Sequence, residues 1–151
     1  MNNIPICHEY EPFKPDLWSS GGVVLRKLDN QTEVLICERS SENLIALPKG
    51  KPNEGEVEEE AAIREVKEET GINAIIKTKI KDIFYSFKNS DEIINKKVSF
   101  FLMEKIDGEI SNHDDEFDKV YWEKCDSALK KLSHQGEKDV LEKAIKLAED
   151  F

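Results

Sequence analysis

The chain has 151 residues, of which 38% are hydrophobic and 36% charged, and this balance is typical of one globular domain with an ordinary core. Its formal net charge of −10 argues against a protein that binds nucleic acid through phosphate neutralisation alone, because such surfaces are strongly basic. An acidic chain can still bind an anionic substrate where divalent cations lie between the two sets of negative charge.

The first residues predict an extended N-terminal arm over 1–17. They contain scattered prolines and acids instead of a basic start followed by an apolar run, so we expect neither a signal peptide nor a transmembrane span. Cytoplasm is the expected location. The cysteines Cys7, Cys37 and Cys125 lack C-x-x-C spacing, which predicts buried or idle thiols and argues against a disulfide framework or a thiolate zinc site.

Short apolar runs, several of them rich in β-branched and aromatic residues, predict the strands. The first two runs flank a turn around Asp29 and Asn30, which indicates a hairpin. In chain order the predicted strands cover 21–28, 33–39, 73–80, 83–87, 97–104 and 119–124.

Two helices are predicted among these strands. Residues 56–70 contain no proline or glycine and are followed by Gly71, so they predict about four helical turns. A second helix begins near Ser133, its expected cap, because the apolar residues at 140, 141, 144, 145 and 148 form one stripe. The sequence therefore predicts one α+β domain over 18–151, with a sheet between helices.

The first helix concentrates negative charge. Glu65, Glu68 and Glu69 stand at i, i+3 and i+4 and share one face, with Glu58 earlier on that face. Like charges at these spacings weaken a helix by a few tenths of a kcal/mol per pair, roughly, so something must compensate. A solvated acidic surface is one interpretation. Bound Mg²⁺, which takes oxygen ligands, is the other. The apolar residues expected against the sheet are Ala62, Ile63 and Val66.

The segment 50–72 resolves this choice, because it matches the signature G-x5-E-x7-R-E-U-x-E-E-x-G-U, where U is apolar. Nine specified positions make a highly specific signal. The segment resembles the Nudix hydrolase family, and the order of strands and helices resembles the Nudix α/β/α sandwich over nearly the whole chain. The matching residues are Gly50, Glu56, Arg64, Glu65, Val66, Glu68, Glu69, Gly71 and Ile72.

The resemblance implies a MutT-like hydrolase that cleaves a diphosphate linkage in a nucleoside diphosphate joined to another group. It implies Mg²⁺ as cofactor, with Mn²⁺ able to substitute. Glu68 and Glu69 would bind the metals, and Glu65 would bind metal or act as general base. Arg64 would orient Glu65, and Glu56 would pair with a basic residue. The backbone near Lys49 and Gly50 would offer a carbonyl to a metal.

A further acid outside the motif is common in this family. In the segment 111–120 we predict Glu116 as this additional metal ligand, and an acidic surface loop is the alternative. The substrate is predicted from "LPKGK" before the helix, which resembles asymmetrical dinucleoside tetraphosphate hydrolases and relatives that act on diphosphoinositol phosphates. Ile45 departs from that pattern, because many of these relatives carry tryptophan there.

Three basic residues, Arg39, Lys49 and Lys51, are predicted to hold the distant phosphates of a long polyphosphate. Tyr85 is predicted to stack on a base, although strand aromatics are more often core. We therefore expect hydrolysis of diadenosine tetraphosphate to ATP and AMP.

Other functions remain open. A Nudix pyrophosphatase could act on nucleoside triphosphates, ADP-ribose or diphosphoinositol phosphates. A non-catalytic nucleotide-sensing module predicts damage to the glutamate set, and the sequence shows none. We expect a small nucleoside polyphosphate as partner, no stable binding of nucleic acid or membrane, and a monomer or homodimer.

Overall fold

The computed structural model describes residues 6–8 and 14–151. The predicted N-terminal arm therefore falls largely outside the described residues. Within it, β1 (Ile6–His8) pairs antiparallel with the strand that passes through Phe84–Ser86.

The strands form one mixed sheet in the order β1-β6-β7-β2-β3-β4, with β5 paired to β2 and β8 paired to β3. The pair β2–β7 is parallel and the other pairs are antiparallel. Because β2 pairs with β7 through its first part and with β3 through its last, it joins the two halves of the sheet. The strands are β2 (Leu17–Leu28), β3 (Gln31–Arg39), β4 (Leu44–Ala46), β5 (Lys49–Gly50), β6 (Ile72–Asn89), β7 (Glu92–Gly108) and β8 (Lys119–Lys124).

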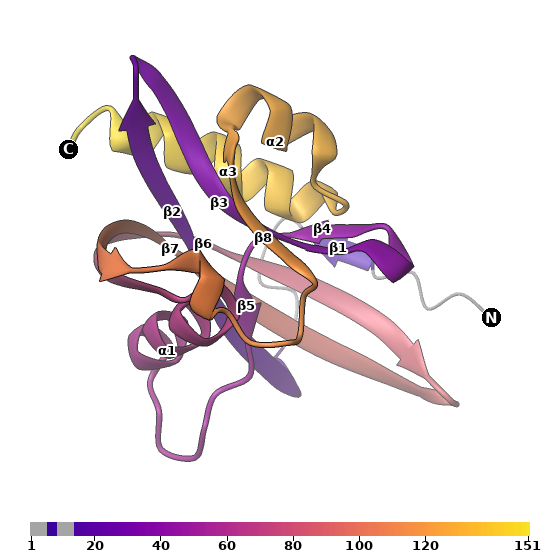
Figure 1. Cartoon of the computed structure of the whole chain (residues 1–151). Helices are drawn as coiled ribbons and strands as arrows, with labels where there is room; N and C mark the ends of the chain where they lie inside the picture. Colours follow the sequence, from indigo (N-terminus) through magenta and orange to yellow (C-terminus); the bar gives the residue numbers. More distant parts are fainter. Residues whose placement is uncertain (1–5, 9–13) are drawn as a thin grey trace.

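In the described part of the chain three α-helices cover this sheet: α1 (Glu58–Thr70) lies on one side, and α2 (Cys125–Lys131) and α3 (Gln135–Ala148) lie on the other (Figure 1). Two 3₁₀ turns, η1 (Ser40–Glu42) and η2 (Ile110–Asn112), connect strands. The predicted α+β sandwich is confirmed. Among the described helices, none is long and apolar enough to cross a membrane.

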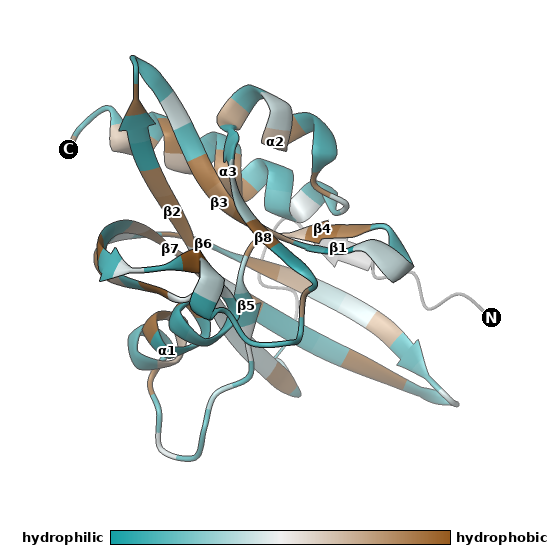
Figure 2. Cartoon of the chain, viewed as in Figure 1, coloured by the Kyte–Doolittle hydropathy of each residue, from teal (hydrophilic) through white to brown (hydrophobic). Residues whose placement is uncertain are grey.

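The central strands are buried on both faces, so neighbouring residues belong to different cores. Val23 packs in the core beneath α2 and α3, whereas Val24 packs in the core beneath α1. Phe100 and Phe101 divide in the same way. Strands that are covered on both faces need continuous apolar runs, and Figure 2 shows hydrophobic residues gathered in the middle of β2 and β3.

Several elements differ from the prediction. The strands expected at 73–80 and 83–87 are one strand, β6, whose bulges interrupt the pattern. The short elements β1, β4, β5 and α2 were not predicted. Ser133 does not cap α3, because His134 precedes the first turn and the Ser133 hydroxyl accepts the Ile45 N–H at 2.8 Å.

The expected packing of Ile63 is also wrong, since 38% of this residue is exposed. Ala62 and Val66, which are four residues apart, point into the core instead. Ile63 lies about 100° further around the helix than Ala62, given roughly 3.6 residues per turn, and this turns it towards solvent.

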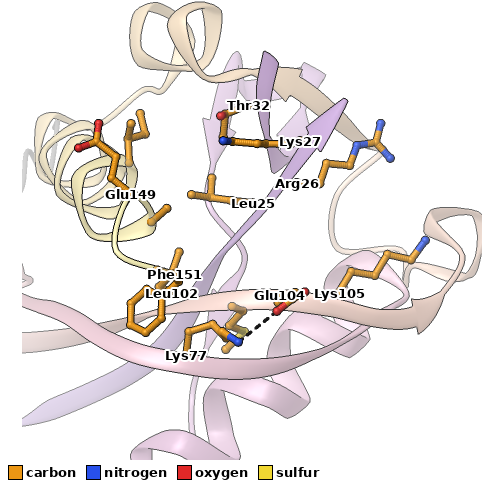
Figure 3. A pocket seen from close by; sticks show the side chains of 13 residues that line it. Leu25, Arg26, Lys27, Thr32, Lys77, Leu102, Glu104, Lys105, Glu149 and Phe151 are labelled. Atoms are coloured by element: carbon orange, nitrogen blue, oxygen red, sulfur yellow. Dashed lines mark ion pairs between the residues drawn. The ribbon is translucent and has the colours of Figure 1, made fainter. Parts of the chain in front are cut away.

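A cavity of about 630 Å³ lies between the β2–β3 hairpin, the β6–β7 pair and the end of α3 (Figure 3). Leu25, Leu102 and Phe151 contribute apolar surface, and the Lys77–Glu104 ion pair of 3.2 Å borders it. No residue of the acidic motif lines this cavity.

Candidate active site

Residues of the acidic motif define where α1 begins and where it ends. The Val57 N–H donates to the Glu60 carboxylate at 3.0 Å, which satisfies a free donor at the first turn. Gly71 ends the helix in the left-handed region with a φ of 79°. A Cβ at Gly71 would lie 2.1 Å from the Glu109 carbonyl oxygen, so both backbone conformation and space require glycine.

Arg64 is the centre of the hydrogen bonds on α1. Its Nε and Nη2 bind the two oxygens of Glu56 at 2.7 and 2.8 Å, and Nη2 also donates to the Lys51 carbonyl at 2.9 Å. Its Nη1 donates to Glu65 at 2.9 Å and to Glu68 at 3.1 Å. All five guanidinium donors are thereby engaged, which fixes the loop before α1 against the helix.

Glu56 makes the basic contact that the motif predicted. The hydrogen bonds from Arg64, together with the Asn53 N–H at 2.7 Å, lower the pKa of Glu56 to about 2. The charge of Glu56 is therefore balanced by Arg64. Glu56 stabilises the loop and the helix that carry the site.

Glu65 lies against the backbone at Gly50. A Cβ at Gly50 would lie 2.1 Å from Oε2 of Glu65, so only glycine lets this carboxylate approach. Burial raises the pKa of Glu65 despite the opposing effect of Arg64, and the charges of Glu68 and Glu116 act in the same direction as burial.

Glu69 is more deeply buried, with 1% of the residue exposed. The Lys49 backbone N–H donates to its Oε1 at 3.2 Å. Burial and the nearby Glu116 charge raise the pKa of Glu69 to about 9, against the opposing effect of Lys49. This carboxyl therefore lies where extra positive charge would be strongly stabilising.

Lys49 also contacts the C-terminal helix. Its ammonium lies 2.9 Å from Glu137 of α3 and donates to the Leu47 carbonyl at 3.1 Å. Burial alone would lower the pKa of Lys49, but the carboxylates of Glu137 and Glu69 outweigh it and raise the pKa. Lys49 thus joins the glutamates of α1 to a different part of the molecule.

Lys49 is one of the residues that line a second cavity, which has a volume of about 180 Å³. Lys96 lines it, and burial together with the charges of Lys49 and Lys51 lowers the pKa of Lys96. Lys49 and Lys96 thus line one cavity, and the charge of Lys96 favours an anionic ligand there. The other lining residues are Tyr85, Phe87, Val98, His134 and Glu137.

Arg39, which was predicted to bind phosphate together with Lys49 and Lys51, contacts Glu116. Its Nε donates to the Glu116 carbonyl at 3.1 Å, and its guanidinium also pairs with Glu42 at 3.4 Å and lies over Phe117. The Glu116 side chain is half-exposed and its charge acts on both Glu65 and Glu69. Arg39 therefore holds the loop that carries Glu116, and its role in binding phosphate stays a prediction.

The carboxylates suit a hard divalent cation by their chemistry. The hydrogen bonds engage one oxygen each of Glu65, Glu68 and Glu69 and leave the second oxygen of each outside these bonds. In residues 6–8 and 14–151, no three His, Cys, Asp or Glu side chains are already gathered as a metal cage. A cation would accordingly share its shell with water and substrate oxygens, as Mg²⁺ commonly does.

The profile of the NUDIX domain matches residues 19–144, which include the whole motif and most of the sheet. The chain belongs to the Nudix family. The residues that the motif specifies thus include the buried Glu65 and Glu69, the Arg64 that uses all five of its donors, and the Gly50 that lies beside Glu65.

Curated Nudix relatives include two mycobacterial proteins. A Mycobacterium tuberculosis protein named as a mutator protein, MutT4, is 32% identical over 85% of this chain and 54% of that protein. The 8-oxo-(d)GTP phosphatase of Mycolicibacterium smegmatis is 32% identical over 76% of this chain and 34% of that protein. The chain thus spans about half and about a third of the length of these two relatives.

One solved structure matches this chain over almost the full length of its own chain. The C. elegans Ap4A hydrolase, crystallised as a binary complex, is 26% identical with a TM-score of 0.72, and the match covers 89% of this chain and 99% of that chain. The sequence relatives and the structural neighbour are thus named for different substrates.

The structure brings most predicted site residues into two adjoining groups. Arg64 binds Glu65 and Glu68, Glu65 lies against Gly50, and Glu69 accepts the Lys49 N–H, while Lys49 and Tyr85 line the small cavity. The sequence analysis did not identify Lys96 or Glu137. Lys96 stood just before the predicted strand 97–104 as one of many lysines, and Glu137 stood in the polar first turn of a predicted helix, so neither carried a signal of its own.

Proposed function

We propose that this protein is a Nudix hydrolase whose domain comprises residues 18–151 and which cleaves a diphosphate linkage in a nucleoside diphosphate joined to another group, with Mg²⁺ as its cofactor. One observation carries the proposal: Lys49 belongs to both parts of the site. Its backbone N–H binds Glu69, and Lys49 also lines the cavity together with Lys96. A phosphate chain in the cavity would therefore extend towards the metal-binding carboxylates.

The residues divide the work as follows. Glu68 and Glu69 would hold the cation, with the backbone at Gly50 and the Glu116 carboxylate as further oxygen donors. A bound divalent cation would neutralise phosphate oxygens and lower the pKa of a bound water. Glu65, held by Arg64, would accept the proton of the attacking water, and burial raises its pKa, which makes it a stronger base than an exposed carboxylate.

The preferred substrate is a dinucleoside polyphosphate such as diadenosine tetraphosphate, giving ATP and AMP. Three neighbouring lysines suit several phosphates, and Tyr85 and Phe87 in the same cavity offer aromatic surface to a base. The similarity to the C. elegans Ap4A hydrolase supports this choice.

A second candidate is hydrolysis of an oxidised purine nucleoside triphosphate. It is favoured by the similarity to the Mycolicibacterium 8-oxo-(d)GTP phosphatase over 76% of this chain. The same carboxylates and the same cation would serve both reactions, so the two candidates differ only in how the cavity holds the remainder of the substrate.

Product analysis by ion-exchange chromatography tests the proposal. The protein is incubated with Mg²⁺ and a panel of diadenosine tetraphosphate, 8-oxo-dGTP, ADP-ribose, nucleoside triphosphates and a diphosphoinositol phosphate. We expect ATP and AMP from diadenosine tetraphosphate at the highest kcat/KM. Preferential cleavage of 8-oxo-dGTP would replace the first candidate with the second, and no metal-dependent cleavage of any compound would contradict both.

A further inference from the structure

Glu137 is a carboxylate that lies outside the Nudix motif and yet contacts the segment beside it. It stands in the first turn of α3 and is completely buried. Its Oε1 accepts the Leu47 N–H at 2.7 Å, and its Oε2 lies 2.9 Å from the Lys49 ammonium. A buried carboxylate is costly unless it is paired, so this contact defines where the ammonium lies.

The Lys49 ammonium has two carboxylates within electrostatic range, those of Glu137 and Glu69. Within the described residues it forms its ion pair with Glu137 and not with Glu69. Glu69 receives only the Lys49 backbone N–H. A lysine ammonium placed directly on Glu69 would occupy the carboxylate oxygens that have to bind a divalent cation, and it would also move away from Glu137.

We propose that Glu137 is a positioning residue, which holds the Lys49 ammonium at the cavity wall and so keeps Glu69 available for the cation. This inference rests on the proposed function. The two oxygens of Glu137 hold opposite ends of the segment 47–49, because one binds the backbone N–H of Leu47 and the other binds the side chain of Lys49. Between these residues the Pro48 carbonyl accepts the Gly22 N–H at 3.1 Å, which fixes the segment to β2.

The backbone of residues 47–49 has little room to move. A Cβ at Gly21 would lie 2.2 Å from the Pro48 carbonyl oxygen, so β2 already contacts the backbone of this segment. The remaining freedom belongs to the Lys49 side chain, whose four-carbon stem could turn its ammonium towards Glu69 if Glu137 no longer attracted it.

The test is divalent-cation binding without substrate, measured by isothermal titration of the full chain with Mn²⁺ alone. Glu137→Gln keeps the side-chain volume and an oxygen for the Leu47 N–H but removes the attraction for Lys49. We expect its Kd for Mn²⁺ to rise about tenfold or more, since loss of a residue that orients the ligands of a metal costs about 10- to 100-fold in metal affinity. Glu142→Gln, on the exposed side of the same helix, is the matched control and should bind Mn²⁺ as the wild type does.

The Lys49→Met background separates positioning from a purely structural role. Without an ammonium there is nothing for Glu137 to hold away from Glu69, so Lys49→Met should bind Mn²⁺ at least as tightly as the wild type while its KM for the nucleotide rises. Lys49→Met with Glu137→Gln should bind Mn²⁺ like Lys49→Met alone, a non-additive result. A structural role of Glu137 would instead weaken binding in both backgrounds.

Three results would overturn the inference: wild-type Mn²⁺ affinity in folded Glu137→Gln, equally weak binding in the double variant, or weakened binding in Lys49→Met alone. The last does not depend on whether Glu137→Gln folds. Wild-type protein that binds Mn²⁺ but cleaves nothing would contradict the proposed function and leave this test in force. Wild-type protein that binds no Mn²⁺ would contradict both.

Discussion

Glu69→Gln should make the metal-free protein more stable at neutral pH while removing its metal-dependent activity. In the folded state the pKa of Glu69 is about 9, compared with an ordinary value of 4.5. The folded protein therefore retains a proton that the unfolded chain releases above its ordinary pKa. Stability that is fully present below pH 4.5 is lost progressively as the pH rises to about 9.

The size of the effect follows from linkage. Each pH unit inside this window costs about 1.4 kcal/mol of unfolding free energy for one retained proton, so the step from about pH 5.5 to 7.5 costs about 2.7 kcal/mol. A neutral glutamine has no proton to release and can still accept the Lys49 N–H. The difference in stability between Glu69→Gln and wild type should grow by that amount over the same step.

Urea unfolding with a chelator present, at several pH values, measures this difference. The difference between the two proteins is the relevant quantity, because other titrating groups contribute to both curves. Added Mg²⁺ should stabilise the wild type by mass action and leave Glu69→Gln unchanged, and the turnover of the variant should fall by orders of magnitude. Stability curves that run parallel from pH 5.5 to 7.5 would refute the argument about burial, and a fully active variant would refute the role in metal binding.

Three other substitutions test the geometry of the site. Gly50→Ala should lower kcat by about 10²-fold with little loss of secondary structure by circular dichroism, because its Cβ would displace the Glu65 carboxylate from a position 2.1 Å away. Arg64→Lys should lower kcat at least about tenfold in initial-rate assays, because one ammonium cannot replace five donors in a planar fork. Gly71→Ala should lower unfolding free energy by more than about 1 kcal/mol beyond Gly55→Ala in urea titrations, since both have positive φ but only Gly71 meets backbone.

The sequence predicted the parts of the molecule that local pattern determines. The spacing of Glu65, Glu68 and Glu69, the helix end at Gly71 and the main strands all follow from short-range rules. β6 was predicted as two strands because its bulges break the alternation. α2 escaped prediction because its seven residues are too few for a helical period to stand out.

The wall of the cavity could not be predicted in the same way. Lys49, Lys96 and Glu137 come from β5, β7 and α3, and only the folded sheet brings them together. In sequence each stands among other charged residues, without spacing that relates one to another. The neighbourhood of Lys96 and Lys49 depends on the pairing of β2 with both β5 and β7, which is a long-range contact.

The partners of the individual glutamates explain why α1 and the loop before it are so acidic. Glu56 is matched by Arg64, Glu58 by Lys79 and Lys97, and Glu60 by the N–H of Val57. These glutamates hold α1 to the loop before it and to β6 and β7. Glu65 shares Arg64 with Glu56 and Glu68, and Glu69 accepts a hydrogen bond from the Lys49 backbone N–H. The carboxyl groups that receive least positive charge from the protein are therefore the two buried ones, Glu65 and Glu69, and a divalent cation would favour their ionised form.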